Sequence, residues 1–387
     1  MKHFPTTHLL TLTGSPRQRG HAHGESLRRQ IRELLLRWKD FLAWTHGVSP
    51  RDYIHEFISQ TNFTPAIEKW TPGLLDEVRG IAEGAAVDFT DIYAFQLQDE
   101  EWWFGQAHKK QPAAAANACS SLAWRGDARH PSLVAQNMDL PDYMHEYQVV
   151  LRIQQDGLPG EILIFSVAGL LALNGMNSSP LAIVCNNLSQ LNHSARGLPV
   201  AFVLRGALEQ SSFERARALL NNCPHASGQN YILGSPSQII DLECSANQVA
   251  PYAPDGRTRG VCHTNHPFVN RDLHPGLASP AASPEMIQAR VEAQAVNSNT
   301  RYQALSTNYN AVEWLNLDPE AVRRLLSLHG SQEHPVCRHA NTPEKWSTLG
   351  ATIMQLSTPA YLYVCPGPPC TAKFTEFTLC LPSNRPL

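Results

Sequence analysis

A cysteine and an aspartate, at the two ends of a predicted β-hairpin, are the residues best placed to do chemistry. Cys119 precedes a short stretch that alternates like a strand, and a turn at 125–127 leads to a second stretch that ends at Asp139. Two strands joined in this way would bring Asp139 back toward Cys119. A thiolate is a strong nucleophile, and a positioned amine or carboxylate helps to form it. If the backbone were cut before Cys119, the new α-amine, whose ordinary pKa is about 8, would be that base.

The order of several elements along the chain resembles one known family. Cys119, the Gln136-Asn137-Met138-Asp139 element and the later His263-Thr264-Asn265-His266 are similar to the isopenicillin N acyltransferase-like family of N-terminal nucleophile (Ntn) hydrolases. That family includes acyl-CoA:6-aminopenicillanate acyltransferase and the β-alanyl-dopamine (carcinine) hydrolases. The likeness extends from Gly20 to about Gly350, with the elements in the family's order.

The resemblance implies a role for each of these residues. Cys119 becomes a new N-terminus when the bond after Ala118 opens, and its thiol attacks an acyl carbonyl while the freed α-amine relays protons. Asp139 holds that amine, and the side-chain amide of Asn265 donates to the oxyanion. The family has glycine where this chain has Ala118, and a Cβ there can hinder an unusual backbone conformation. The plainer interpretation makes Cys119 a buried inert thiol and Asp139 a turn cap.

Three further residues match positions near the family's active site and are expected to bind substrate. They are Asn186, with Asn187 as the alternative, Ser245 and Ser347. The family's Ser-Arg-Gly-Ala-Thr element corresponds to residues 347–352 here but lacks the arginine. A penicillin substrate, whose carboxylate such a cation would bind, is therefore not favoured.

Helical periodicity predicts a mainly helical segment before Cys119. Apolar residues recur at spacings of three and four between 20 and 41, and a second helix includes 74–84, where small residues permit close helix packing. The acidic and aromatic run Asp99–Trp103 is either a solvated helix end or a contact for a substrate amine. Residues 105–118 lack periodicity, which predicts a linker.

After Cys119 the pattern becomes that of strands interrupted by helices, which indicates an α+β fold. The runs 146–153 and 161–167 form a predicted hairpin. The resemblance implies a four-layer αββα sandwich of two antiparallel sheets, the Ntn-hydrolase fold. We expect residues 1–118 to form a helical leading segment that ends in a processing linker, and residues 119–387 to form the nucleophile chain with the αββα core.

Composition limits the classes of binding partner and the cellular compartment that we expect for this protein. Charged residues make up 17% of the 387, and the formal net charge is −3, so nucleic acid and anionic membrane are poor candidates. No apolar run approaches the roughly 20 residues that span a bilayer, and the start of the chain lacks a signal-peptide core. Nine cysteines without framework spacing fit reduced thiols, so we expect a cytoplasmic protein.

Metal binding is not favoured by the spacing of the histidines and cysteines. His21 and His23, beside glycines, suit a helix start better than a metal site. The segment Cys262–His266 has the residue types of a zinc half-site, but positions 263 and 266 of a strand face opposite sides. The pairs in Cys337–His339 and Cys365–Cys370 would complete a metal site only if the fold happened to bring them together. We expect no metal and no cofactor.

The sequence thus predicts an enzyme that cleaves itself and then acts through Cys119 as an N-terminal cysteine amidohydrolase or acyltransferase. Its expected partners are small N-acyl amide or acyl-thioester substrates, which form a thioester with the enzyme, and its own cleaved leading segment. Two alternatives remain open. One is a non-catalytic binding protein that keeps the fold, which Ala118 and the absent arginine would favour. The other is a zinc-dependent hydrolase.

Overall fold

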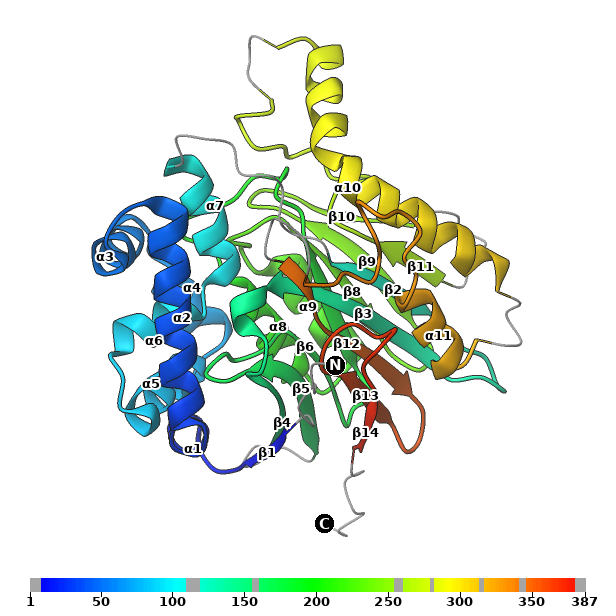
Figure 1. The fold of residues 1–387 in the computed structure, drawn as a ribbon. Helices are drawn as coiled ribbons and strands as arrows, with labels where there is room; N and C mark the ends of the chain where they lie inside the picture. The colour runs from blue at the N-terminus through cyan, green and yellow to red at the C-terminus, as the bar shows by residue number, and fades with distance from the viewer. Residues whose placement is uncertain are drawn as a thin grey trace.

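Two β-sheets pack face to face at the centre of the computed structural model, with helices around them (Figure 1). The structure describes residues 8–108, 119–154, 160–253, 260–278, 282–312, 317–340 and 346–379. The larger sheet contains, in spatial order, β1 (His8–Leu12), β4 (Gln148–Gln154), β5 (Glu161–Val167), β6 (Asn174–Asn177), β7 (Ala182–Asn187), β8 (Gln229–Gly234), β9 (Ile239–Cys244) and β10 (Val249–Pro251). The smaller sheet contains β11 (Gly260–His263), β2 (Ser120–Trp124), β3 (Ser132–Pro141), β12 (Trp346–Leu356), β13 (Tyr361–Cys365) and β14 (Thr375–Thr378).

The helices fall into a group before Cys119 and a group after it. The first group is α1 (Pro16–Ser26), α2 (Arg28–His46), α3 (Pro50–Gln60), α4 (Thr64–Trp70), α5 (Leu74–Ala85), α6 (Phe89–Phe95) and α7 (Gln98–His108). The second group is the 3₁₀ turn η1 (Asp142–Met144), α8 (Val200–Leu208), α9 (Phe213–Asn222), α10 (Pro284–Ala311) and α11 (Pro319–Leu326). Among the described residues, no helix combines the length and the apolar character that crossing a bilayer requires.

The sheets and the second group of helices form the four expected layers. Strands β2 and β3 of the smaller sheet contact β7 and β8 of the larger one. Helices α8 and α9 pack against β6, β7 and β8, whereas α10 and α11 pack against β11, β3 and β12. The arrangement is therefore helices, sheet, sheet, helices, with α1–α6 beside the sandwich (Figure 1). The predicted αββα fold is confirmed.

The central hairpin is buried on both of its faces, and apolar residues fill both sides of its middle part. Ala123 and Val134 face the larger sheet, whereas Leu122 and Leu133 face the cluster beneath α10 and α11. The two strands are antiparallel, with Ser120 opposite Asn137. This register brings the position before Ser120 next to the end of β3, so the predicted hairpin is confirmed.

Glycines set the contact between α1 and α5. A Cβ on Gly20 would lie 1.9 Å from the carbonyl oxygen of Glu77, and a Cβ on Gly80 would lie 2.3 Å from that of Arg17. Because side chains cannot fit there, the two helix backbones touch, which confirms the predicted close packing. His23, inside α1, is buried and accepts a hydrogen bond from the backbone N–H of Gly169 at 3.0 Å. This histidine is thus part of the packing.

The leading segment is mainly helical, as expected, and its strand β1 pairs in parallel with β4, so the larger sheet is mixed. Two other expectations for this segment need correction. The acidic run is not a solvated helix end, since Glu100 and Glu101 are buried. Helix α7 continues to His108, into the predicted linker, and residues 109–118 lie outside the described part of the chain.

Candidate active site

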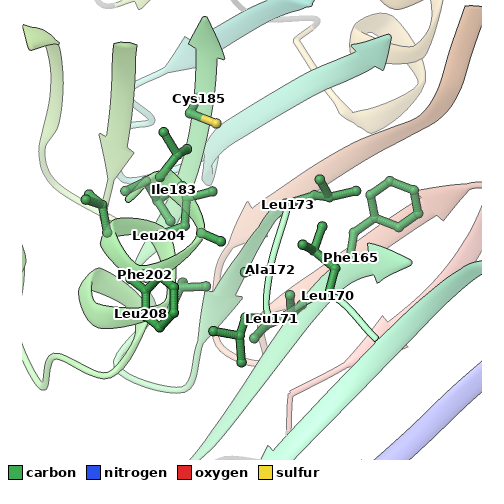
Figure 2. Close-up of a cluster of buried hydrophobic side chains, with 14 of the residues drawn as sticks. Phe165, Leu170, Leu171, Ala172, Leu173, Ile183, Cys185, Phe202, Leu204 and Leu208 are labelled. Carbon is green, nitrogen blue, oxygen red and sulfur yellow. The ribbon is translucent and has the colours of Figure 1, made fainter. Parts of the chain in front are cut away.

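A partly open cavity lies where the ends of the central strands meet α7 and α8. Much of its wall is apolar and comes from the buried cluster that Figure 2 shows, in which Leu170, Ala172 and Leu173 precede β6, and Leu204 lies on α8. The polar wall residues come from both sides of position 119. They are Gln96, Gln98, Asp99, Cys119, Asp139, Asn187 and Gln229.

Cys119 lies on the wall of this cavity, directly before β2. Its side chain is 6% exposed, and its sulfur lies 3.5 Å from the sulfur of Met138. Burial raises the pKa of the Cys119 thiol to about 12, and the nearby negative charge of Asp139 adds to that rise. The thiol is therefore protonated at neutral pH in the uncut chain, and it needs a base to become a nucleophile.

Asp139 is a buried carboxyl group at the end of β3. Its Oδ1 accepts a hydrogen bond from Thr348 Oγ1 at 2.7 Å, whereas no donor in the described part of the chain reaches its Oδ2. Burial raises the pKa of Asp139 to about 6, although the charges of Arg338 and Arg301 favour the ionised form. One carboxyl oxygen beside Cys119 is thus available for a donor or a cation.

Arg301 reaches this region from α10, 182 residues after Cys119. One guanidinium nitrogen donates to the carbonyl oxygen of Cys119 at 2.6 Å and to Ser120 Oγ at 2.9 Å, and another donates to Asn265 Oδ1 at 2.9 Å. Burial lowers the pKa of Arg301 to about 10, so the group stays charged at neutral pH. The sequence analysis missed this arginine, because a single cation on a long helix matches no motif.

The two asparagines at the end of β7 serve the site from opposite faces of the strand. Asn186 Nδ2 donates to the carbonyl oxygen of His263 at 3.0 Å and lies 3.5 Å from that of Cys119. Asn187 lines the cavity, and its Nδ2 donates to Asp99 Oδ1 at 2.9 Å. The alternatives that the sequence left open are therefore both present at the site, in different positions.

Asn265 lies beside the site but not on the cavity wall. Its Nδ2 donates to the backbone carbonyl of Asn187 at 2.9 Å, and its backbone N–H donates to Ser298 Oγ at 2.6 Å. Together with the bond from Arg301, these contacts fix the side chain next to the Cys119 backbone. The oxyanion role stays a prediction, since this amide donates to a protein carbonyl.

Ser245 and Ser347, which were expected to bind substrate, do not line the cavity. Ser245 Oγ donates to Asp272 Oδ2 at 2.7 Å, in a turn. The Ser347 hydroxyl bonds to Asp142, and its oxygen lies 2.9 Å from His145 Nε2. Both hydroxyls therefore stabilise local structure. The other predicted residue, Ala118 at the cleavage site, lies outside the described residues.

The leading segment contributes an electronegative wall through Asp99. Asn187 Nδ2 and Gln229 Nε2 donate to Asp99 Oδ1 at 2.9 Å and 2.8 Å. Burial raises the pKa of Asp99, against the effect of these two hydrogen bonds. The buried amide oxygens of Asn187 and Gln229 have no donor within the described residues. This wall thus offers several acceptors to a ligand.

The zinc half-site considered at Cys262–His266 does not form. Both ring nitrogens of His263 are engaged, with Thr264 O at 2.8 Å and with Glu243 Oε1 at 3.0 Å. His266 Nδ1 lies 2.7 Å from Ser298 Oγ. Among the described residues, these side chains do not converge on a shared point that could hold an ion.

The part of the chain that forms most of the site also matches a known family. The family model described as acyl-coenzyme A:6-aminopenicillanic acid acyl-transferase matches residues 124–368, which is more than half of the chain. The match includes Asp139, Asn186, Asn265, Arg301 and the Thr348 element but begins five positions after the cysteine.

Three individual proteins are similar to this chain. The 40 kDa form of acyl-coenzyme A:6-aminopenicillanic-acid-acyltransferase of Emericella nidulans is 25% identical over 263 residues, which cover 67% of this chain and 70% of that protein. The structure of penicillin V acylase from Agrobacterium tumefaciens has a TM-score of 0.42 and 16% identity, over 67% of this chain and 86% of its own. A mutant of the conjugated bile acid hydrolase from Clostridium perfringens has a TM-score of 0.35 and 12% identity, over 68% and 97%. By its family match, the chain belongs to the acyl-coenzyme A:6-aminopenicillanic acid acyl-transferase family of enzymes.

Proposed function

We propose that the protein opens its own chain between Ala118 and Cys119 and then acts as an N-terminal cysteine amidohydrolase or acyltransferase on small N-acyl amides. In the self-cleavage step, the Cys119 sulfur forms a bond to the carbonyl carbon of residue 118 as the peptide C–N bond breaks, and the thiol proton passes to the nitrogen that becomes the α-amine of Cys119. Water then hydrolyses this thioester, which leaves a free thiol and a free α-amine on Cys119.

The same two groups would perform the reaction with substrate. The sulfur bonds to the acyl carbon as the amide C–N bond breaks, and the thiol proton passes through the α-amine to the leaving amine. Water, or an acceptor amine, then takes the acyl group from the thioester and restores the thiol. An amine close to its own pKa suits this relay, which the uncut thiol, with its pKa of about 12, cannot start unaided.

The observation that carries the proposal is the Asp139 carboxyl oxygen beside Cys119 that no donor among the described residues reaches. A buried acceptor without a donor costs free energy, and a new ammonium on Cys119 would satisfy it. Arg301, which holds the Cys119 carbonyl, and Asn265, which Arg301 orients, would keep the new terminus in place. Asn265 is the proposed oxyanion donor, through an amide hydrogen not used by Asn187.

Contacts across position 118 support retention of the leading segment after cleavage. Glu77 on α5 accepts hydrogen bonds from Arg19 and from Arg205 on α8, and all three side chains are buried. Glu100 on α7 accepts from Ser227 Oγ at 2.7 Å. The segment 1–118 would thus remain bound to the nucleophile chain, as part of one folded unit.

The cavity supports a substrate class. Its leucines and Ala172 suit an apolar group. Asp99 and the amide oxygens of Asn187 and Gln229, to which no described residue donates, suit an ammonium or another donor-rich group. We therefore propose N-acyl amides that combine an apolar portion with a cationic or donor-rich portion. The described cysteines are free thiols, in agreement with a reducing compartment such as the cytoplasm.

Denaturing mass spectrometry of the purified protein tests the cleavage. The proposal expects fragments of 118 and 387 − 118 = 269 residues, with Cys119 at one new N-terminus. Cys119→Ala should abolish cleavage and activity, and Cys119→Ser should retain slow cleavage. The control is Cys185→Ala, since Cys185 is a second buried cysteine on the same cavity wall and should not be needed for cleavage. An intact 42.9 kDa chain that hydrolyses amides would refute the self-cleavage mechanism.

A panel of N-acyl amides tests the substrate class. Asp99→Asn should raise KM for ammonium-bearing substrates by about tenfold or more, because a hydrogen bond to a charged group contributes about 1.5–3 kcal/mol. KM for neutral substrates of the same size should change little. Equal effects on both substrate sets would exclude Asp99 as the recognition group.

A further inference from the structure

Two histidines and two cysteines converge near the surface, in a part of the molecule that the proposed reaction does not use. His329 follows α11, Cys337 and His339 lie in the segment before β12, and Cys370 lies between β13 and β14. One ligand atom from each of the four lies within 4.8 Å of all the others. The backbone N–H of Cys337 donates to the carbonyl of Leu328 at 2.9 Å, which brings this segment back to the end of α11.

Three of the six ligand–ligand separations are close to the edges of a metal-centred tetrahedron, and the other three are no longer than 4.8 Å. His329 Nε2 and Cys370 Sγ each lie 3.2 Å from His339 Nε2, and the sulfurs of Cys337 and Cys370 are 3.5 Å apart. With Zn–N bonds of about 2.0–2.1 Å and Zn–S bonds of about 2.3 Å, tetrahedral coordination places the ligand atoms ~3.3–3.8 Å from one another. The observed distances agree with this range to within about 0.3 Å.

Hydrogen bonds and a disulfide explain the cluster less well. An imidazole Nε2 has one in-plane direction for a hydrogen bond, yet His339 Nε2 has two polar partners at the same distance. The two sulfurs are far beyond the ~2.05 Å of a disulfide bond. Four nitrogen and sulfur ligand atoms gathered this closely are instead typical of a metal site.

We propose that His329, Cys337, His339 and Cys370 bind one Zn²⁺ ion as a structural site. Two thiolates and two neutral imidazoles are a donor set that zinc prefers, and they complete four-coordination. No position is left for a water or a substrate, so this zinc would not be catalytic. The site differs from the zinc half-site considered at Cys262–His266 and does not depend on cleavage at position 118.

The zinc would fix the chain segment that supports Asp139. Arg338 lies between two of the ligands, and its backbone N–H donates to Thr348 Oγ1 at 3.0 Å. Thr348 N–H donates in turn to the carbonyl of Arg338 at 3.2 Å, and Thr348 Oγ1 donates to Asp139 Oδ1. Loss of the metal would therefore loosen Thr348, which donates to the Asp139 carboxyl group, as well as the segment 337–339 that carries two of the ligands.

Metal analysis of the full-length protein tests the proposal. Protein purified without chelator from zinc-supplemented cells should contain one zinc per chain by inductively coupled plasma mass spectrometry. His329→Ala and Cys370→Ser should each lose most of this zinc. The matched controls are His334→Ala and Cys365→Ala, which alter a histidine and a cysteine of the same region outside the cluster and should retain it. Cobalt-loaded wild type should show the visible absorption of tetrahedral thiolate coordination.

Other outcomes would overturn the proposal. Zinc-free wild-type protein that also fails to bind added Zn²⁺ or Co²⁺ would exclude the site, as would zinc content that the ligand variants leave unchanged. A Cys337–Cys370 disulfide, found by non-reducing peptide mapping in protein kept in reductant, would assign the cysteines to another role. If the ligand variants fail to fold, zinc release from the wild type on thiol modification, measured with a metal-sensitive dye, decides the question. Absence of release then counts against the site.

Discussion

Replacing Asp139 by Asn should stabilise the uncut chain near pH 8 and have little effect near pH 4. The comparison is best made in a Cys119→Ala background, because the proposed cleavage would otherwise supply an ammonium that changes the environment of the carboxyl group. Asparagine has nearly the same shape as aspartate, keeps an oxygen for the Thr348 hydroxyl and carries no charge. The substitution therefore isolates the cost of the buried charge.

The magnitude follows from the pKa of the buried group. Burial raises the Asp139 pKa from its ordinary 3.8 to about 6, and each pKa unit is worth about 1.4 kcal/mol, so the penalty is about 3 kcal/mol. Between these two values, the folded chain binds more protons than the unfolded chain. Stability therefore falls as pH rises through this window, and the full penalty is present above it. The asparagine variant lacks this pH-dependent loss.

Urea unfolding followed by tryptophan fluorescence measures the effect. The double variant should exceed Cys119→Ala in the free energy of unfolding by about 3 kcal/mol near pH 8 and by about zero near pH 4. Asp272→Asn is a control of opposite sign, since burial raises the Asp272 pKa but hydrogen bonds from Ser245 and Asn247 outweigh it and lower that pKa. This second variant should lose stability near pH 8.

Two results would refute the reasoning about Asp139. A stability difference that stays constant between about pH 4 and pH 8 would mean that the carboxyl group is not ionised at a cost in the folded chain. A loss of stability on acidification of Cys119→Ala from pH 6 to pH 4, with no such loss in the double variant, would mean that the Asp139 pKa is lowered rather than raised.

Three further predictions concern packing and positioning. Gly80→Ala should lower the free energy of unfolding by about 1–3 kcal/mol, because its Cβ would meet the carbonyl of Arg17, and an unchanged urea midpoint would contradict the close contact of α1 with α5. Arg301→Lys should slow cleavage by about 100-fold, since it loosens the Cys119 backbone, whereas Arg290→Ala on the same helix should cleave normally in a gel time course. Glu77→Gln should cost about 3–5 kcal/mol in urea unfolding, because it removes the carboxylate that the buried Arg19 and Arg205 share and leaves Arg205 with the ion pair to Glu209. A smaller loss would mean that water reaches the two guanidinium groups.

The parts of the fold that the sequence predicted are those with a local pattern. Alternation and a turn predicted the β2–β3 hairpin and so the approach of Asp139 to Cys119, and the small residues of 74–84 predicted that α5 packs closely on another helix, which the structure shows to be α1. These features depend on residues close together in the chain or on a simple period. The four-layer arrangement was predicted from the resemblance to a family whose elements follow in the same order along the chain.

The sequence analysis missed or misplaced residues whose position is set by the face of a strand or by contacts between distant parts of the chain. In the Ser347–Thr352 element, Thr348 reaches Asp139, whereas Ser347, one position earlier, points to the opposite face of β12. Arg301 comes from a helix with no motif to mark it. The cluster at His329, Cys337, His339 and Cys370 forms only when three separate segments of the chain meet, which the spacing alone could not indicate.

The cavity wall contributed by α7 has an evolutionary consequence. Asp99 precedes the predicted cut, and the groups that hold it, Asn187 and Gln229, come from the other side of that cut. A chimera that exchanges residues 1–118 between two relatives would thus transplant a substrate preference while leaving the sulfur, its amine and their carboxylate unaltered. Divergence of selectivity within the family can then proceed in a region that contains no reacting atom.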